Sequence, residues 1–141
     1  MTPAVAAAPA ALPAAEAWRA AAQAHADLFG PLDPGARIAL LARSAPTQAL
    51  LWEAGAGGVG VRTVAFEGYA ATGADIVLAA DDESLACVRG SSAAGLFEVL
   101  RAGIRSGHIV CYQLRRRCVL EERGFEELLD ALGFAFMGAC R

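Results

Sequence analysis

The chain has 141 residues, a formal net charge of −3 and a hydrophobic fraction of 56%. This length corresponds to one domain, and the apolar fraction excludes a chain that is disordered throughout. The acidic balance argues against a protein dedicated to binding nucleic acid or an anionic membrane surface. No apolar run reaches the roughly 18 residues that a membrane-spanning helix needs.

The first twelve residues are rich in Ala and Pro and carry no basic side chain. They do not resemble a signal peptide, so we predict a disordered leader at 1–12 and a single α/β domain at 13–141. A protein without an export signal is expected in the cytoplasm, where thiols stay reduced. The cysteines expected to be free are Cys87, Cys111, Cys118 and Cys140. With no Cys-x-x-Cys pair and only two histidines, we expect no metal site and no cofactor.

Residues 13–29 have the apolar spacing of a helix, and this helix comes before any predicted strand. Its apolar stripe consists of Trp18, Ala22, His25 and Phe29. Because His25 lies on that stripe, we interpret it as a partly buried packing residue. The sequence Gly-Pro-Leu-Asp-Pro-Gly at 30–35 then ends the helix.

Five short apolar runs follow and are predicted to be strands. They are nearly continuous rather than alternating, which is typical of strands buried on both faces. These runs are 38–42, 61–66, 76–80, 109–114 and 134–140. Helical patterns separate most of them, at 46–54, 81–90, 91–107 and 115–132.

The order of these elements predicts an α/β fold. We expect a mostly parallel or mixed five-stranded sheet, flanked by helices, with an extra N-terminal helix. No helical pattern joins the runs at 61–66 and 76–80, so these two are expected to form a hairpin or an edge pair. Asp81, Asp82 and Glu83 are interpreted as the capped start of a helix, because acidic residues stabilise a helix N-terminus.

Ligands of open α/β sheets bind near the carboxyl ends of the strands. This rule selects 43–44, 81–83 and 111–117 as candidate stretches, and the third is the most informative. Cys111 is expected near the end of a strand and close to the start of the next helix. The helix dipole together with Arg115, Arg116 and Arg117 would favour its thiolate and lower its pKa. The alternative is a buried, inert Cys111 beside a solvated arginine face.

Two other cysteines bear on this hypothesis. Cys118 follows Cys111 by seven residues, and we weigh a role as a resolving thiol against a place in the core. Cys87 lies in a helical pattern and is interpreted as a core residue.

The last third of the sequence resembles the DsrE/TusD-like sulfur-relay family. The similar pattern is a helix at 96–106, a glycine, a strand from His108 to Cys111, an arginine-rich helix start and a helix at 122–130. The resemblance implies a small α/β protein, often oligomeric, whose strand-end Cys accepts sulfane sulfur as a persulfide and passes it to a protein partner. It makes Cys111 the catalytic residue. The binding residues assigned around it are His108, Arg115, Arg116, Arg117 and Cys118.

A second resemblance leads to a different function. Residues 74–78 and 83–90 are similar to the middle section of sterol-carrier-protein-2-like domains, in which a strand and a short helix frame an apolar lipid tunnel. This resemblance implies a carrier of lipid or another apolar ligand. A third hypothesis is a regulatory or assembly module without chemistry. We expect a protein partner or homo-oligomer, and whether the protein is an enzyme stays open.

Overall fold

The computed structural model of the protein describes residues 11–134. These residues form a five-stranded sheet with helices before, between and after its strands. The elements are α1 (Ala15–Ala24), α2 (Ala26–Phe29), β1 (Arg37–Ala42), β2 (Gln48–Gly55), β3 (Gly58–Ala65), η2 (Ala70–Thr72), β4 (Ile76–Ala80), α3 (Asp82–Gly90), α4 (Leu96–Ser106), β5 (Ile109–Gln113), α5 (Arg117–Glu122) and α6 (Glu126–Ala131). The predicted α/β class and N-terminal helix are confirmed.

The sheet is mixed, with the strand order β3-β2-β1-β4-β5. β1 and β4 are parallel, whereas β1–β2, β2–β3 and β4–β5 are antiparallel pairs. The five-stranded sheet is thus confirmed in its mixed form, and a mostly parallel sheet is wrong. The loop from β1 to β2 is too short for the crossover that a parallel pair requires. Between β4 and β5, the two helices α3 and α4 return the chain to the end of the strands at which β4 stops. β5 therefore runs antiparallel to β4.

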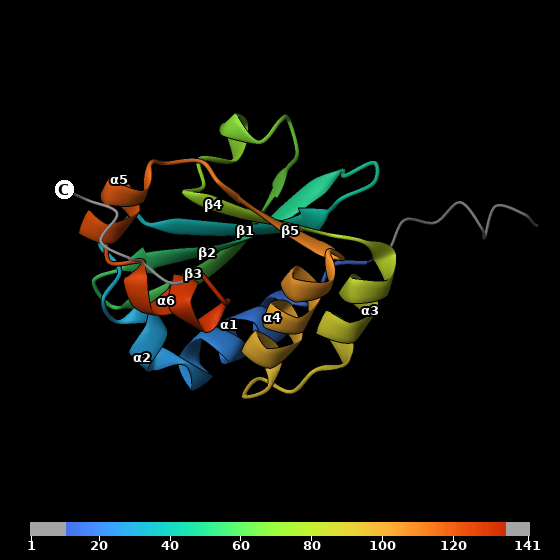
Figure 1. The fold of residues 1–141 in the computed structure, drawn as a ribbon, viewed down its shortest axis with the longest axis horizontal. Coiled ribbons are helices and arrows are strands. Elements are labelled where there is room, and N and C mark those ends of the chain that lie inside the picture. Colours follow the sequence, from blue (N-terminus) through green and yellow to red (C-terminus); the bar gives the residue numbers. More distant parts are fainter. Residues whose placement is uncertain (1–10, 135–141) are drawn as a thin grey trace, which may run out of the picture.

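The main hydrophobic core lies between one face of the sheet and the helices. Figure 1 shows α1, α2, α3, α4 and α6 on the same side of the strands. Alternate strand residues, including Ile38, Leu40, Ile76 and Leu78, point into this core. They meet apolar residues from every α-helix. Burying such a face is what holds amphipathic helices on a sheet.

An aromatic cluster fills the middle of this core. Trp18 of α1 stacks on Trp52 of β2 with ring centroids 3.8 Å apart and planes 3° from parallel. The indole nitrogen of Trp52 donates a hydrogen bond of 2.7 Å to the backbone oxygen of Trp18. Phe29 meets Trp52 edge to face, and Phe97 of α4 lies nearly parallel to it. These contacts hold α1 on the sheet, both through the apolar area that the rings bury and through the preferred geometry of their stacking.

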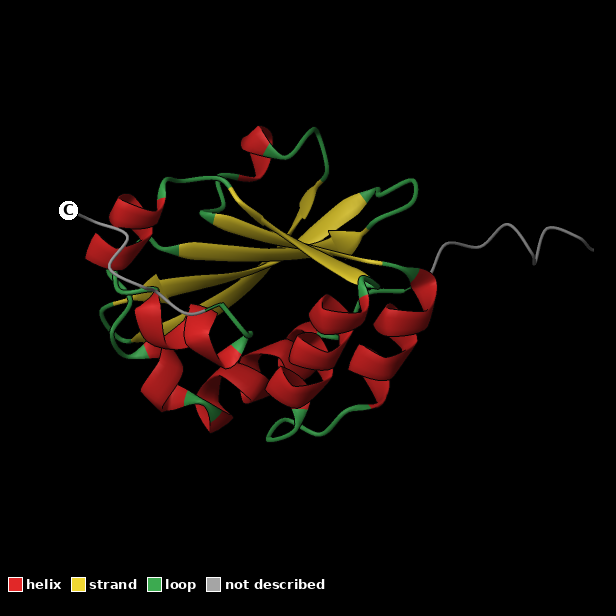
Figure 2. Ribbon diagram, in the orientation of Figure 1, coloured by secondary structure: helices red, strands yellow, loops and turns green. Residues whose placement is uncertain are grey.

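The other face of the sheet is covered by the segment at 66–75, which contains η2. Figure 2 shows this segment above the strands, away from the helical layer. Phe66 and Tyr69 pack against a small core built largely from alanines, including Ala39 and Ala79. Tyr112 of β5, which is 40% exposed, contacts the Tyr69 ring at the margin of this core.

The structure corrects the helix predicted at 46–54, which is strand β2. Its residues alternate between the two cores: Leu50 and Trp52 face the helices, whereas Ala49 and Leu51 face the other side. Burial on both faces therefore outweighed the helix propensity of Ala and Leu. The glycine-rich stretch after β2 does not end a helix but forms a tight hairpin, in which Gly55 pairs with Gly58.

The predicted pairing of 61–66 with 76–80 is also wrong. β3 is an edge strand that pairs with β2, and β4 lies between β1 and β5. The sequence predicted a helix where β2 lies. The predicted sheet therefore did not contain the strand with which β3 pairs.

The helices predicted at 81–90, 91–107 and 115–132 correspond to α3, α4 and α5–α6, but α4 begins only at Leu96 and α5 only at Arg117. Asp81 caps α3 by accepting a hydrogen bond of 2.9 Å from the Ser84 amide. Gly107 follows α4 with a φ of 85°, and Gly124 separates α5 from α6 with a φ of 87°. These left-handed conformations suit glycine at helix ends.

Two predicted features lie largely outside the described residues. They are the leader at 1–12, of which Ala11 and Leu12 are described, and the last strand at 134–140, of which Phe134 is described.

Candidate functional site

β5 runs antiparallel to β4, so its first residues lie beside the end of β4 and the arginines that follow it lie at the opposite end of the strands. Asp81 follows β4, and its amide donates to the backbone oxygen of His108, which precedes β5. At the opposite edge, the amide of Leu114 donates to the backbone oxygen of Asp75, just before β4. His108 and the arginines at 115–117 therefore lie at different edges of the sheet. The expectation that all three candidate stretches share one edge is wrong for 111–117.

Cys111 is a free thiol in the middle of β5, on the face that packs against the helices. Burial raises the pKa of its thiol to about 12. The predicted lowering of this pKa is therefore wrong, because desolvation disfavours the thiolate that a sulfur nucleophile needs.

This environment predicts slow chemistry at Cys111. In the folded protein at neutral pH, iodoacetamide should label exposed Cys87 and leave Cys111 unmodified. Peptide mass spectrometry after timed labelling measures both sites, and labelling in urea is the positive control for Cys111. Rapid alkylation of Cys111 in the native protein would contradict the placement described above.

Arg115, the first of the three arginines, pairs with a carboxylate that precedes β4. The Nε of Arg115 lies 3.2 Å from a carboxylate oxygen of Asp75, which is 2% exposed. Arg116 is exposed and precedes α5, and Arg117 is the first residue of that helix. The ion pair with Asp75 accounts for the arginine that follows β5. This explanation requires no interaction between Arg115 and Cys111.

The other cysteines depart from the sequence-based expectations as well. Cys87 is exposed on α3, so its predicted place in the core is wrong. Cys118 lies half-buried in α5 and is disulfide-bonded, so the expectation of a free thiol fails there. Cys140 lies outside the described residues.

His108 belongs to a polar cluster at the carboxyl ends of β1 and β4. Its Nδ1 lies 2.5 Å from a carboxylate oxygen of Asp81, and a guanidinium nitrogen of Arg43 lies 3.9 Å from the same oxygen. Arg43 also donates to the backbone oxygen of Gly107. The hydrogen bond and the charge of Asp81 raise the pKa of His108, and the hydrogen bond with His108 lowers the pKa of Asp81.

This pair makes the free energy of unfolding depend on pH. The contribution of His108 is fully present below its ordinary pKa of 6.5 and is lost as the pH rises through the raised pKa. We expect the urea midpoint of the native protein to fall over this range, and that of His108→Gln to fall less. Urea unfolding monitored by circular dichroism at several pH values measures the difference. Parallel curves for the two proteins would show that the pair does not form.

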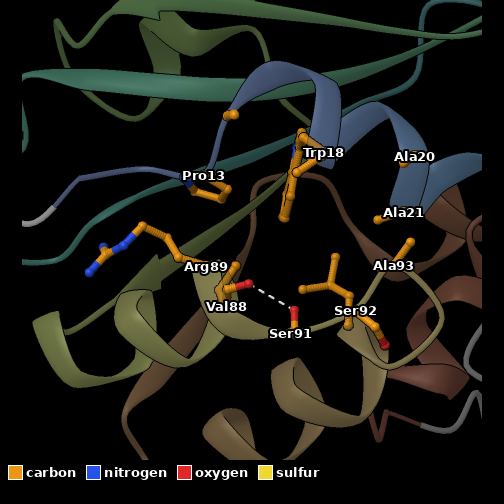
Figure 3. A pocket seen from close by; sticks show the side chains of 12 residues that line it. Pro13, Trp18, Ala20, Ala21, Val88, Arg89, Ser91, Ser92 and Ala93 are labelled. Atoms are coloured by element: carbon orange, nitrogen blue, oxygen red, sulfur yellow. Dashed lines mark hydrogen bonds between the residues drawn. The ribbon is translucent and has the colours of Figure 1, made fainter.

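A groove lies between α1 and the α3–α4 region, and we call it the α1–α3 groove. Its volume is about 440 Å³, and Figure 3 shows its lining side chains. The lining residues are Pro13, Ala14, Ala17, Trp18, Ala20, Ala21, Val88, Arg89, Ser91, Ser92, Ala93 and Leu96.

Small side chains on α1 create this hollow. Ala17 and Ala21 leave room where larger residues would fill the space, while Trp18, Val88 and Leu96 form broader apolar walls. Three polar side chains complete the lining, and the hydroxyl of Ser91 donates to the backbone oxygen of Val88. The groove is thus mainly apolar with a few polar groups, as ligand pockets commonly are.

Sequence analysis missed this groove. A signal was present, because Ala14, Ala17 and Ala21 recur at helical spacing around Trp18. The same spacing occurs where two helices pack closely, so the pattern alone does not separate a hollow from a contact.

Within residues 11–134, no helix combines the length and apolar character needed to cross a bilayer. The same part of the chain contains no group of three or more His, Cys, Asp or Glu side chains placed to hold a metal ion.

Comparisons with known proteins assign no family to the chain. No protein-family model matches it, and no curated protein matches it. A solved structure described as "UbiJ-SCP2 Ubiquinone synthesis protein" is similar over 80% of this chain and 74% of its own, with 18% sequence identity and a TM-score of 0.40. A likeness at this level carries no functional argument, so the function has to be inferred from the side chains themselves.

Proposed function

We propose that the protein binds an apolar small molecule, or the apolar chain of an amphiphile, in the α1–α3 groove. The groove itself carries this proposal. Its volume of 440 Å³ falls within the range of about 300–1,000 Å³ typical of ligand pockets, and its walls are mostly apolar. A ligand there would remove the exposed side chain of Ala17 from water and would contact the apolar walls formed by Val88 and Leu96.

The lining favours binding over catalysis. Among the twelve residues that line the groove, none is a histidine, cysteine or carboxylate. General acid–base catalysis relies mainly on such groups, and a serine nucleophile needs an adjacent base, which these lining residues do not supply. Arg89, Ser91 and Ser92 provide polar contacts that orient a bound molecule without reacting with it.

This proposal corresponds to the second resemblance in the sequence, a sterol-carrier-protein-2-like carrier of apolar ligands. The sulfur-carrier hypothesis has no comparable support. Its premises were a thiolate at Cys111 and a nearby arginine cluster, whereas burial raises the pKa of that thiol and Arg115 pairs with Asp75.

Octanoate provides a test, because Trp18 lines the groove and reports on its contents. We expect octanoate to change tryptophan emission and raise the melting temperature, since a ligand stabilises the state that it binds. Ala17→Phe fills the groove. If the ligand has to overpack against this ring at a cost of about 1–3 kcal/mol, its affinity falls by about 5- to 150-fold.

Ala24→Phe is the matched control, because Ala24 is exposed on the same helix and lies outside the groove lining. It places the same side chain in α1 and should leave octanoate binding unchanged. Equal affinities for the native protein and Ala17→Phe would show that the ligand binds elsewhere. Absence of binding to the native protein would reject the proposed function.

A further inference from the structure

The chain approaches α1 through a short segment, residues 11–13, that separates two hollows. Pro13 lines the α1–α3 groove and also a second hollow of about 370 Å³. The second hollow lies against the sheet and includes Ala42, Leu50 and Thr63 in its lining. Figure 3 shows the segment near Pro13 running between the strands and α3. Both hollows therefore meet at this segment.

Few contacts hold residues 11–13 in place. A guanidinium nitrogen of Arg89 donates a hydrogen bond to the backbone oxygen of Ala11. Leu12 packs half-buried against the main core, and Pro13 is buried. Within residues 11–134, the sheet ladder does not include this segment. A segment that lacks ladder hydrogen bonds, and is held by one exposed hydrogen bond and the packing of Leu12 and Pro13, opens more easily than a strand inside the sheet.

We propose that residues 11–13 are a displaceable strap, whose movement joins the α1–α3 groove and the second hollow into one longer binding groove. This inference rests on the proposed function. A short ligand occupies the α1–α3 groove with the strap in place. A longer chain extends toward the sheet, takes over the position of Leu12 and breaks the bond from Arg89 to Ala11. The strap thereby makes affinity depend on ligand length.

The strap determines affinity through the population of its displaced state. The apparent affinity of a ligand that requires an open state is reduced by the fraction of protein in that state. Weakening the strap raises this fraction, so it strengthens binding of long chains. Short chains, which bind beside the closed strap, are unaffected.

Octanoate and palmitate test the inference, because they share a carboxylate and differ in chain length. Dissociation constants from tryptophan fluorescence would be compared for the native protein, Leu12→Ala and Arg89→Gln. A tenfold rise in the open fraction would increase the ratio of palmitate to octanoate affinity by about tenfold in both variants. The ratio cancels any direct effect of Arg89 on the shared carboxylate.

Arg105→Gln is the control, since Arg105 is an exposed arginine in the last turn of α4 and lies away from the strap. It should leave the ratio unchanged. Unchanged ratios in both strap variants, with octanoate still bound, would overturn the strap and leave the proposed function standing. If neither carboxylate binds the native protein, the proposed function fails and the strap fails with it. Circular dichroism of each variant confirms that it is folded.

Discussion

Gly124→Ala is expected to destabilise the fold by about 2–5 kcal/mol, combining left-handed backbone strain with overpacking. Gly124 has a φ of 87°, and a methyl group there would clash with the backbone oxygen of Pro31. The methyl group would meet backbone atoms, so no side chain can rotate away to make room for it. The neighbouring backbone oxygen of Arg123 accepts a hydrogen bond of 2.9 Å from Asp33, which holds the α5–α6 turn against the loop before β1.

Gly107→Ala separates the effect of backbone strain from the effect of overpacking. Gly107 has a similar φ of 85°, but an added methyl group would meet no atom within 4 Å. Only the left-handed strain applies, so we expect a loss of about 1–2 kcal/mol. Urea unfolding of both variants measures the comparison. Equal losses would show that the turn moves away from Pro31 at little cost.

Asp75→Asn is expected to cost about 1–3 kcal/mol, because it removes the charge of a buried carboxylate that accepts a hydrogen bond and pairs with two arginines, which are themselves partly exposed. Asp75 accepts a hydrogen bond from the backbone amide of Arg37 and forms ion pairs with Arg115 and Arg123. These three residues come from β1, the segment after β5 and the α5–α6 turn. One carboxylate thus joins three parts of the chain that are distant in sequence.

Glu53→Gln is the matched control. Glu53 pairs with Arg37 and Arg62, but about a third of its side chain is exposed. Exposed ion pairs contribute about 0–1 kcal/mol, so the expected loss is small. Combining Asp75→Asn with Arg115→Gln should cost less than the two single losses added together, because both variants disrupt one pair. Strict additivity of the urea unfolding free energies would show that this pair does not interact.

Local patterns in the sequence were sufficient to predict most elements but not their pairing. β1, β4 and β5 have continuous apolar runs, and α3 has the acidic start typical of a capped helix. The main error was the helix predicted in place of β2, since Ala, Leu and Trp also occur in helices. Only the two cores on either side of the sheet reveal why these residues form a strand, and a core is a property of the whole fold.

The candidate site depended even more on long-range geometry. Whether His108 or Arg115 lies beside Asp81 follows from the direction of β5, which no local pattern determines. The groove is less predictable still, because a hollow beside Trp18 is defined by side chains of α3 and α4 that are distant in sequence. The residue types indicated which reactions were candidates. The groups that surround each side chain in the fold determine which of these reactions it can carry out.

The parallel pairing of β1 with β4 also has a consequence for how the protein folds. The hairpin of β2 and β3 closes over a two-residue turn, whereas the Asp75 carboxylate meets the Arg37 amide across 38 residues. Closing the longer loop costs more chain entropy, so the hairpin can form early and the β1–β4 ladder must come later. Until that ladder forms, the inner edge of β1 stays unpaired and open to contacts with other chains. The pairing of β4 with β1 therefore closes an edge at which the folding chain could otherwise aggregate.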